Sequence, residues 1–259
     1  MQRILSSMRK AIEAYHMIEE NDKIAVCISG GKDSITLLHG LKALQRFYPK
    51  HFELIAISVN PGFDFFDTEL LQQSCDEIDV HIKKKKSDIK EIVFNIRKEK
   101  NPCSLCANLR RGIINTVAIR EGCNKIALGH HFNDVIETTL LSMLYGSEIK
   151  TMMPKLHSEN FEGLELIRPL FLVKEDAIIA WAKHNELRFL NCACRFTEKS
   201  SYDESLSKRK EVKNLIKEMK KTNENADYNI FKALDNVNID CILGYKKNKE
   251  YHNFLDDYL

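Results

Sequence analysis

The stretch Ile24–Gly40, IAVCISGGKDSITLLHG, joins a short apolar run to an apolar pattern at helical spacing. The apolar run ends at Ile28, and a polar hexapeptide, Ser29–Ser34, follows it. A run of this length predicts a buried strand, and the pattern after the hexapeptide predicts a helix at 33–47. The hexapeptide is therefore expected to be the turn between a strand and a helix.

This turn has the chemistry of an anion-binding site. Backbone N–H groups at the start of a helix lack partners within it, and the helix dipole is positive there. Gly30 and Gly31 allow the backbone to approach an anion closely. Lys32 adds a positive charge, and Asp33 or Ser34 can cap the helix. The spacing is not that of the Walker A pattern or of the dinucleotide pattern G-x-G-x-x-G, and an ordinary strand-to-helix turn is the alternative.

Apolar runs and helical patterns alternate along most of the chain. Strands are predicted at 24–28, 54–59, 80–83, 125–129 and 164–167, and helices at 33–47, 67–77, 89–98, 107–121, 133–145 and 174–185. The polar stretch 146–163 is predicted to be irregular. The alternation predicts an α/β fold with a parallel, doubly wound sheet flanked by helices, in which ligands bind beyond the carboxyl ends of the strands.

Three parts are predicted along the chain. An amphipathic N-terminal helix occupies 1–20, and an α/β domain that contains a C-x-x-C pair occupies 21–186. The remainder, 187–259, is expected to complete the site. It is predicted to hold a cysteine loop at 190–201, helices at 204–221 and 228–237, and a polar tail.

Composition and charge limit the function classes. With 259 residues, 44% of them hydrophobic and 29% charged, the chain is expected to be globular. Because no apolar run approaches the roughly 18 residues that cross a bilayer, we expect a cytoplasmic protein with no membrane partner. The net charge of +2 is too small to indicate a general nucleic-acid binder. Residues 83–100 and 208–221 are nevertheless locally basic, which fits either RNA contacts or solvated helix faces.

The eight cysteines indicate metal or redox chemistry, because a reducing cytoplasm disfavours a disulfide framework. Cys103 and Cys106 form a C-x-x-C pair beside a helix expected to begin near Ser104, where the helix dipole lowers thiol pKa values. Cys192 and Cys194 form a second close pair. Structural zinc on all four, a catalytic dithiol at the first pair and an iron–sulfur cluster are the alternatives. Ordinary core or surface positions are expected for Cys27, Cys75, Cys123 and Cys241.

A second strand-to-helix turn lies in LGHHFNDVIET, residues 128–138. Gly129 is expected to let a nucleotide lie against the backbone, and Asp134 to hold the Mg²⁺ that accompanies a triphosphate. A charge that complements the helix dipole is the alternative for Asp134. The neighbours His130 and His131 point in opposite directions on an extended backbone, so they are not expected to chelate one ion. Arg168 follows a predicted strand and is a candidate phosphate contact.

Several segments, in this order, resemble the tRNA 2-thiocytidine synthetase (TtcA) family of PP-loop, or N-type, ATP pyrophosphatases. They are SGGKDS (29–34), PCSLCANLRRGI (102–113), KIALGHHFNDVIET (125–138), MMPKL (152–156), IRPL (167–170) and the pair Cys192 and Cys194. The resemblance implies a Rossmann-like sheet of the adenine nucleotide alpha-hydrolase type. The chain departs from the family at Asn133-Asp134, where related enzymes usually show two acidic residues, so Asp134 is left as the expected magnesium ligand.

The resemblance implies an ATP-dependent sulfur transferase. ATP would be cleaved between its α- and β-phosphates, a base carbonyl, C2 of cytidine in tRNA, would become an adenylate, and sulfur would replace the oxygen with release of AMP and pyrophosphate. Lys32, Asp33 and Cys194 are the implied catalytic residues. The implied ATP-binding residues are Ser29, Gly30, Gly31, Lys32, Asp33, Ser34, Gly129, Asp134 and Arg168.

The resemblance also implies cofactors and partners. A 4Fe-4S cluster would be held by Cys103, Cys106 and Cys194, with Cys192 as the alternate third ligand, and its open iron would bind the sulfur. The implied partners are tRNA, a sulfur donor such as a cysteine desulfurase or free sulfide, and a second copy of the chain that meets the first helix. The alternatives are a desulfidase-type enzyme on a small thiolated substrate, another PP-loop enzyme such as a tRNA lysidine synthetase, and a zinc-stabilised nucleotide-binding protein.

Overall fold

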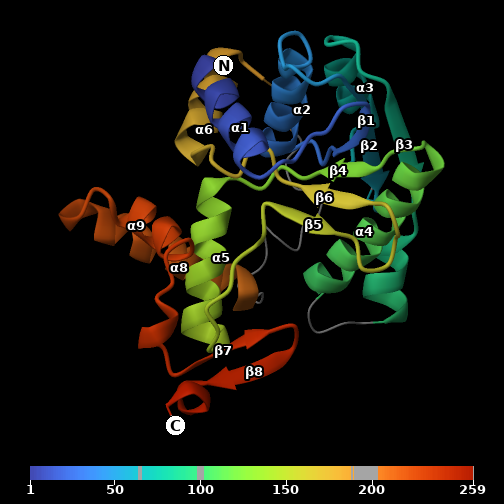
Figure 1. Cartoon of the computed structure of the whole chain (residues 1–259). Helices are drawn as coiled ribbons and strands as arrows, with labels where there is room; N and C mark the ends of the chain where they lie inside the picture. The colour runs from blue at the N-terminus through green and yellow to red at the C-terminus, as the bar shows by residue number, and fades with distance from the viewer. Residues whose placement is uncertain (64–65, 98–101, 188, 190–203, 259) are drawn as a thin grey trace.

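A twisted sheet forms the centre of the computed structural model, which describes residues 1–63, 66–97, 102–187, 189 and 204–258 (Figure 1). In this part of the chain the sheet has six strands in the order β3-β2-β1-β4-β6-β5. Five are parallel, and β5 runs antiparallel to β6 at one edge. The strands are β1 (Asp22–Cys27), β2 (Phe52–Asn60), β3 (Ile82–Lys86), β4 (Lys125–Ala127), β5 (Lys155–His157) and β6 (Glu165–Ile167). The predicted α/β fold is confirmed.

Helices cover both faces of the sheet (Figure 1). One face carries α1 (Gln2–Ala14), α2 (Lys32–Leu44), α3 (Thr68–Asp76) and α6 (Glu175–His184), and the other carries α4 (Pro102–Arg120). Side chains of β1 alternate between the two cores, because Ile24 and Val26 pack with the first group of helices while Ala25 packs with α4. Each core is therefore built from one face of the same strands.

The C-terminal helices pack on α5 (Phe132–Gly146) rather than on the sheet. Val212 and Ile216 of α8 (Glu204–Thr222) are buried against Phe132 and Ile136 of α5, and α9 (Ala226–Ala233) contacts both helices. This small third core holds α8 near the carboxyl end of β4, where the chain continues into α5.

The first helix is shorter than predicted and its apolar face is already used. It ends at Ala14, and its buried residues pack against α2 and α6. Met8 lies so close to Gly40 of α2 that a side chain at position 40 would collide with its thioether. The apolar residues of α1 are therefore occupied within the chain, which argues against the helix as the contact surface of a second copy.

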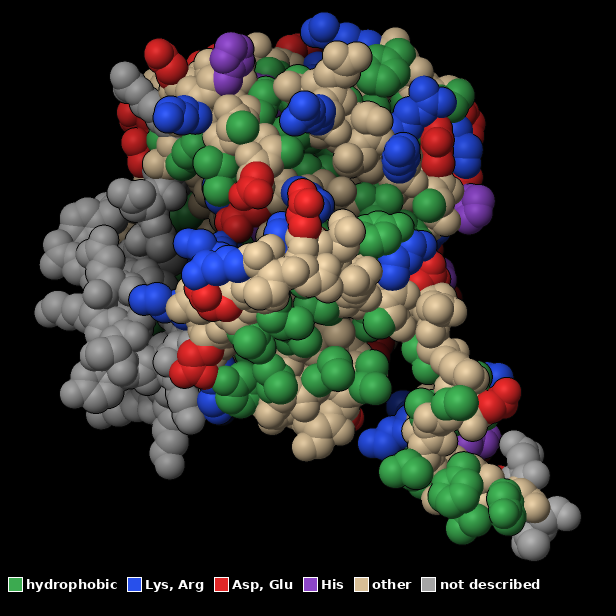
Figure 2. Space-filling view, turned by 90° about the vertical axis from the view of Figure 1, so that its left-hand side faces the viewer, with side chains coloured by type: hydrophobic (Ala, Val, Ile, Leu, Met, Phe, Trp, Pro, Cys, Tyr) green, Lys and Arg blue, Asp and Glu red, His purple; other side chains and the backbone are tan. Residues whose placement is uncertain are grey.

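The structure corrects the sequence-based expectations at several short elements. The helix predicted at 89–98 is helical from 89 to 96, but its last six residues, Glu91–Ile96, form a π-helix. The irregular stretch 146–163 contains β5. The polar tail contains a hairpin of β7 (Gly244–Lys247) and β8 (Glu250–Asn253), whose two-residue turn has positive φ at Asn248 and Lys249. Figure 2 shows this C-terminal segment standing away from the main body.

No helix among the described residues is long and apolar enough to span a lipid bilayer.

Candidate functional site

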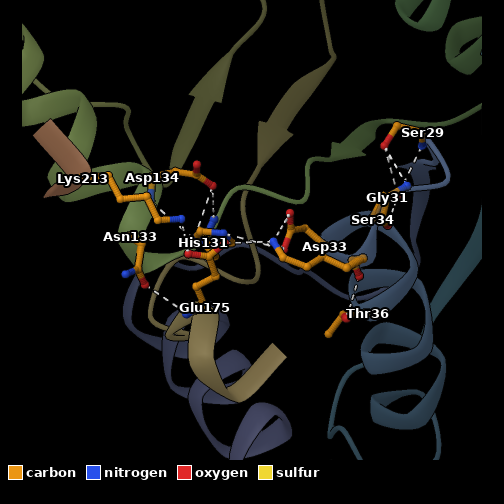
Figure 3. Close-up of polar contacts among 11 residues, drawn as sticks. Ser29, Gly31, Asp33, Ser34, Thr36, His131, Asn133, Asp134, Glu175 and Lys213 are labelled. Atoms are coloured by element: carbon orange, nitrogen blue, oxygen red, sulfur yellow. Dashed lines mark hydrogen bonds and ion pairs between the residues drawn. The ribbon is translucent and has the colours of Figure 1, made fainter. Parts of the chain in front are cut away.

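The turn between β1 and α2 is closed by its own side chains. Gly30 has a φ of +85°, a left-handed conformation that favours glycine. The Ser29 N–H donates to the Ser34 hydroxyl (3.2 Å), which in turn donates to the Gly31 carbonyl (2.9 Å) (Figure 3). Within the described chain no side chain caps this end of α2, contrary to the expected cap by Asp33 or Ser34. Its first N–H groups therefore remain available to an anion.

Lys32 lies between two carboxylates at this turn. Its Nζ is 2.9 and 3.1 Å from the two carboxylate oxygens of Asp33 and 3.1 Å from Oε1 of Glu175, the first residue of α6. Burial acts against the charge of Lys32, but the hydrogen bonds and negative charges of Asp33 and Glu175 outweigh it and raise the pKa of Lys32. The ammonium group therefore stays charged.

The second turn, between β4 and α5, packs directly on the first. A side chain at Gly129 would come within 3.2 Å of the backbone of Asp33 and Ser34, so the close approach of the two turns requires glycine. His131 and Asp134 form a reciprocal cap on α5, with the His131 N–H donating to the Asp134 carboxylate at 3.0 Å and the Asp134 N–H to His131 Nδ1 at 3.4 Å. Asp134 thus complements the helix N-terminus, the alternative considered for it above.

Both turns open into one pocket of about 430 Å³, a size that suits a small ligand. Of the residues predicted to bind ATP, Ser29, Asp33, Ser34, Gly129 and Asp134 line it. Gly30, Gly31 and Lys32 belong to the same turn but are not among the lining residues. Two of the other lining residues carry polar groups that sequence reasoning did not assign to the site, Asn115 and Cys27. Asn115 is buried, and its carboxamide oxygen has no hydrogen-bond partner within the described part of the chain. Cys27 also lines the pocket, and burial raises the pKa of its thiol to about 12, so it stays protonated.

One face of α4 joins the cysteine pair to the pocket wall. The helix begins at Pro102, two residues earlier than expected, so Cys103 and Cys106 lie in its first turns. Ala107 and Arg110 follow them at a spacing of four residues, on the same helix face, and both line the pocket. Arg110 Nη2 is 3.9 Å from Cys106 Sγ. The thiols therefore lie at one end of the pocket wall.

This donor set fits an anionic metal cluster. Cysteine thiolates are the usual ligands of iron–sulfur clusters, and the guanidinium group of Arg110 lies beside Cys106, where it can offset the negative charge of such a cluster. The Nε of Arg110 is buried without a hydrogen-bond partner within the described ranges. Cys192 and Cys194 lie outside the described residues, so the choice between them stays a prediction.

Arg168 is not among the residues that line the pocket. It is buried behind His130, which does line it, and donates from Nε to His130 Nδ1 at 3.3 Å and from Nη1 to the Met153 carbonyl. Burial, followed by the charge of Arg168, lowers the pKa of His130 to about 4, so the imidazole is neutral at pH 7. A direct phosphate contact by Arg168 stays a prediction.

The low pKa of His130 predicts a pH-dependent stability. Below pH 6.5 the imidazole of His130 becomes protonated in the unfolded chain but stays neutral in the folded chain. The free energy of unfolding therefore falls as the pH falls towards 4. We expect His130→Gln to remove about 1.5 kcal/mol of that fall between pH 6.5 and 5. Urea unfolding of both proteins at these pH values measures it, with the exposed His51→Gln as the control. Equal pH dependence in the wild type and His130→Gln would contradict the prediction.

Three cations of the basic run 208–221 pair with carboxylates of neighbouring helices, although their side chains stay 36–54% exposed. Arg209 lies 3.4 Å from the buried carboxylate of Glu137 on α5, and Lys213 lies 2.7 Å from Oε2 of Glu175. Lys220 similarly pairs with Asp227 of α9 at 2.8 Å. These cations hold α8 in place. In the other basic run, by contrast, Lys84, Lys85 and Lys86 of β3 are exposed.

Comparison with known proteins agrees with this geometry. Residues 3–219 match the family model described as PP-loop domain. A tRNA-cytidine(32) 2-sulfurtransferase from Geotalea uraniireducens is 38% identical over 237 residues, 91% of each chain, and one from Syntrophotalea carbinolica is 38% identical over 229 residues, 88% of this chain and 86% of that one. The solved structure of the U34-tRNA thiolase NcsA from Methanococcus maripaludis with its [4Fe-4S] cluster aligns with a TM-score of 0.70 and 26% identity, covering 91% of this chain and 81% of that chain.

Proposed function

Because the chain belongs to the PP-loop domain family, in the group of tRNA-cytidine(32) 2-sulfurtransferases, we propose that it is an ATP-dependent enzyme that replaces the O2 oxygen of a cytidine in tRNA with sulfur. The observation that carries the proposal is the arrangement of α4. One face of this helix carries the C-x-x-C thiols and also residues that line the pocket between the two turns. An enzyme that activates a base and then delivers sulfur to it needs both at one place.

The turn between β1 and α2 (Ser29–Ser34), called the phosphate turn below, would bind ATP during activation of the base. The ammonium group of Lys32 and the N–H groups at the start of α2 hold the β- and γ-phosphates and stabilise the charge that develops on pyrophosphate. The base oxygen forms a bond to the α-phosphorus while the bond to the β-phosphate oxygen breaks, which leaves the base adenylated. Sulfide then forms a bond to C2, and AMP leaves with the former base oxygen.

Two carboxylates and the cysteines complete the proposed site. Asp33 and Asp134 both line the pocket and can share a Mg²⁺ ion with the triphosphate, which lowers the charge repulsion during phosphate cleavage. Cys103, Cys106 and Cys194, with Cys192 as the alternate, would hold a [4Fe-4S] cluster that supplies the binding site for the sulfur. Arg110 next to Cys106 would offset the negative charge of such a group.

The proposed partners follow from the same chemistry. The exposed lysines of β3 can contact the RNA backbone, and a cysteine desulfurase or free sulfide supplies the sulfur in the cytoplasm. A second copy of the chain is a further proposed partner. The exposed Leu243, Tyr251, Leu255 and Tyr258 of the C-terminal segment suit that contact better than α1, whose apolar face is buried.

The proposal is tested with anaerobically reconstituted protein, unmodified tRNA, ATP and sulfide. We expect one 2-thiocytidine per AMP released, measured by mass spectrometry of the digested tRNA, and tRNA affinity that falls steeply between low and moderate salt. A tRNA with uridine at the modified position is the matched control. A colourless protein with stoichiometric zinc and no thiolated nucleoside would instead support the zinc-stabilised nucleotide-binding alternative.

A further inference from the structure

Glu175 lies at a junction between the phosphate turn and the C-terminal helices. Its side chain is only 15% exposed, and its two carboxylate oxygens contact different lysines. Oε1 is 3.1 Å from Lys32 Nζ on α2, and Oε2 is 2.7 Å from Lys213 Nζ on α8 (Figure 3). One carboxylate thus links the cation of the phosphate site to the helix that follows the second cysteine pair.

The contact with Lys32 limits where that ammonium group can point. An ammonium group has three N–H donors. Two oxygens of Asp33 and one of Glu175 lie within 3.1 Å of it, so a phosphate oxygen that bound Lys32 would replace one of the two Asp33 contacts. Without Glu175, the four-carbon side chain of Lys32 would be held from one side only, by a carboxylate on the adjacent residue.

We propose that Glu175 is a positioning residue that orients Lys32 towards the phosphates of ATP and couples this orientation to α8 through Lys213. The inference rests on the proposed function, since it assigns a role within the ATP-cleaving step. It goes beyond that function because Glu175 need not contact the nucleotide itself.

Glu175 acts as a permanent negative charge. Burial alone would raise the pKa of its carboxyl group, but hydrogen bonds from Lys213 and Lys32 outweigh that effect and lower the pKa to about 2. The carboxylate is therefore ionised at any pH at which the enzyme is assayed.

The fold does not depend on the Glu175 side chain alone. The N–H of Glu175 donates to Oδ1 of Asn133 at 3.0 Å, and this backbone contact survives any side-chain change except proline. Asp227 accepts from Lys174 at 3.0 Å and from Lys220 at 2.8 Å, which fixes α6 and α8 to α9 independently. A substitution at Glu175 can therefore be tested in a folded protein.

The first test compares Glu175→Gln, Glu175→Asp and the neighbouring control Asp176→Asn. We expect Glu175→Gln to lower kcat for AMP formation about 10-fold or more while KM for ATP changes less than about threefold, because the misdirected Lys32 stabilises the leaving pyrophosphate less well. Glu175→Asp should recover part of the rate, and Asp176→Asn should match the wild type. A kcat of Glu175→Gln within twofold of the wild type would overturn the inference.

The coupling to α8 is tested by a double-mutant cycle. If Lys213 acts through Glu175, Lys213→Met should lower kcat several-fold, and the double variant with Glu175→Gln should be no slower than Glu175→Gln alone. Lys217→Met, an exposed lysine one turn further along α8, is the matched control. Multiplicative effects of the two substitutions would refute the coupling.

A readout without turnover separates this inference from the proposed function. Acylation of Lys32 by an amine-reactive ester, quantified by mass spectrometry, reports how strongly its ammonium group is held in the protonated form. We expect labelling of Lys32 to rise at least about threefold in Glu175→Gln and to stay unchanged in Asp176→Asn. If the wild type labels Lys32 weakly and Glu175→Gln strongly, but no tRNA is thiolated, the proposed function fails and the positioning of Lys32 stands. Equal labelling in all three proteins would overturn the positioning role.

Discussion

Lys32→Ala is expected to lower kcat/KM for ATP-dependent AMP formation by about a thousandfold or more. The substitution removes the cation that stabilises the leaving pyrophosphate, and it also leaves the carboxylates of Asp33 and Glu175 uncompensated beside the triphosphate. Both effects act in the same direction, so both ATP affinity and turnover should fall. Steady-state measurement of AMP release, together with calorimetric titration of ATP, separates the two contributions.

Two further variants help to explain the expected loss of AMP formation in Lys32→Ala. Lys42 lies on the same helix, and its ammonium group donates to the Asp79 carbonyl. Lys42→Ala should therefore keep full activity. The double variant Lys32→Ala/Glu175→Gln removes one of the uncompensated carboxylates, so it should regain part of the ATP affinity but none of the turnover. A Lys32→Ala protein that keeps more than a tenth of the wild-type rate would contradict the assigned role of this turn.

Cys103→Ala is expected to abolish the cluster and with it the thiolation of tRNA. A [4Fe-4S] cluster with three cysteine ligands loses a third of them in this variant, and an iron–sulfur site left with two protein thiolates should not retain the cluster. Iron content and the visible absorption band should disappear under anaerobic reconstitution, and thiocytidine should fall below detection. Affinity for ATP should stay within about twofold of the wild type, because the turn at Lys32 belongs to a different element.

The control for this variant is Cys241→Ala, an exposed cysteine in the C-terminal segment. It should keep its iron and its activity. A Cys103→Ala protein that carries a full cluster and thiolates tRNA would show that the C-x-x-C pair does not hold the metal.

The two turns that line the pocket could be predicted because their signal is local. Ser29–Ser34 and Gly129 owe their roles to backbone conformation and close approach, and short motifs record both. Glu175 could not be found this way, since an acidic residue in the first turn of a helix looks like an ordinary partner of the helix dipole. Its two lysines come from α2 and α8, far apart in the sequence, and only the folded chain brings them together.

The basic run of α8 shows that sequence can also suggest a binding surface whose charges are paired within the folded chain. Its lysines and arginine suggested a nucleic-acid surface, but Arg209, Lys213 and Lys220 find carboxylates within the chain. The charge count was visible in the sequence, whereas the pairing depends on tertiary contacts with α5, α6 and α9. Short strands were missed for another reason. The three residues of β5 carry polar or exposed side chains at a sheet edge, so they lack the apolar run that marks a buried strand.

The docking of α8 also bears on how a metal site could assemble. Its ion pairs to α5 and α6 fix the chain on the far side of the second cysteine pair, while α6 fixes the near side at His184. Cys192 and Cys194 lie between these two points in the sequence, within a segment of about twenty residues, and the entropy of bringing the ends of a flexible segment together grows only with the logarithm of its length. If Cys194 is the third ligand, as proposed, its binding to a metal held by Cys103 and Cys106 is an intramolecular step, with an effective concentration on the order of millimolar.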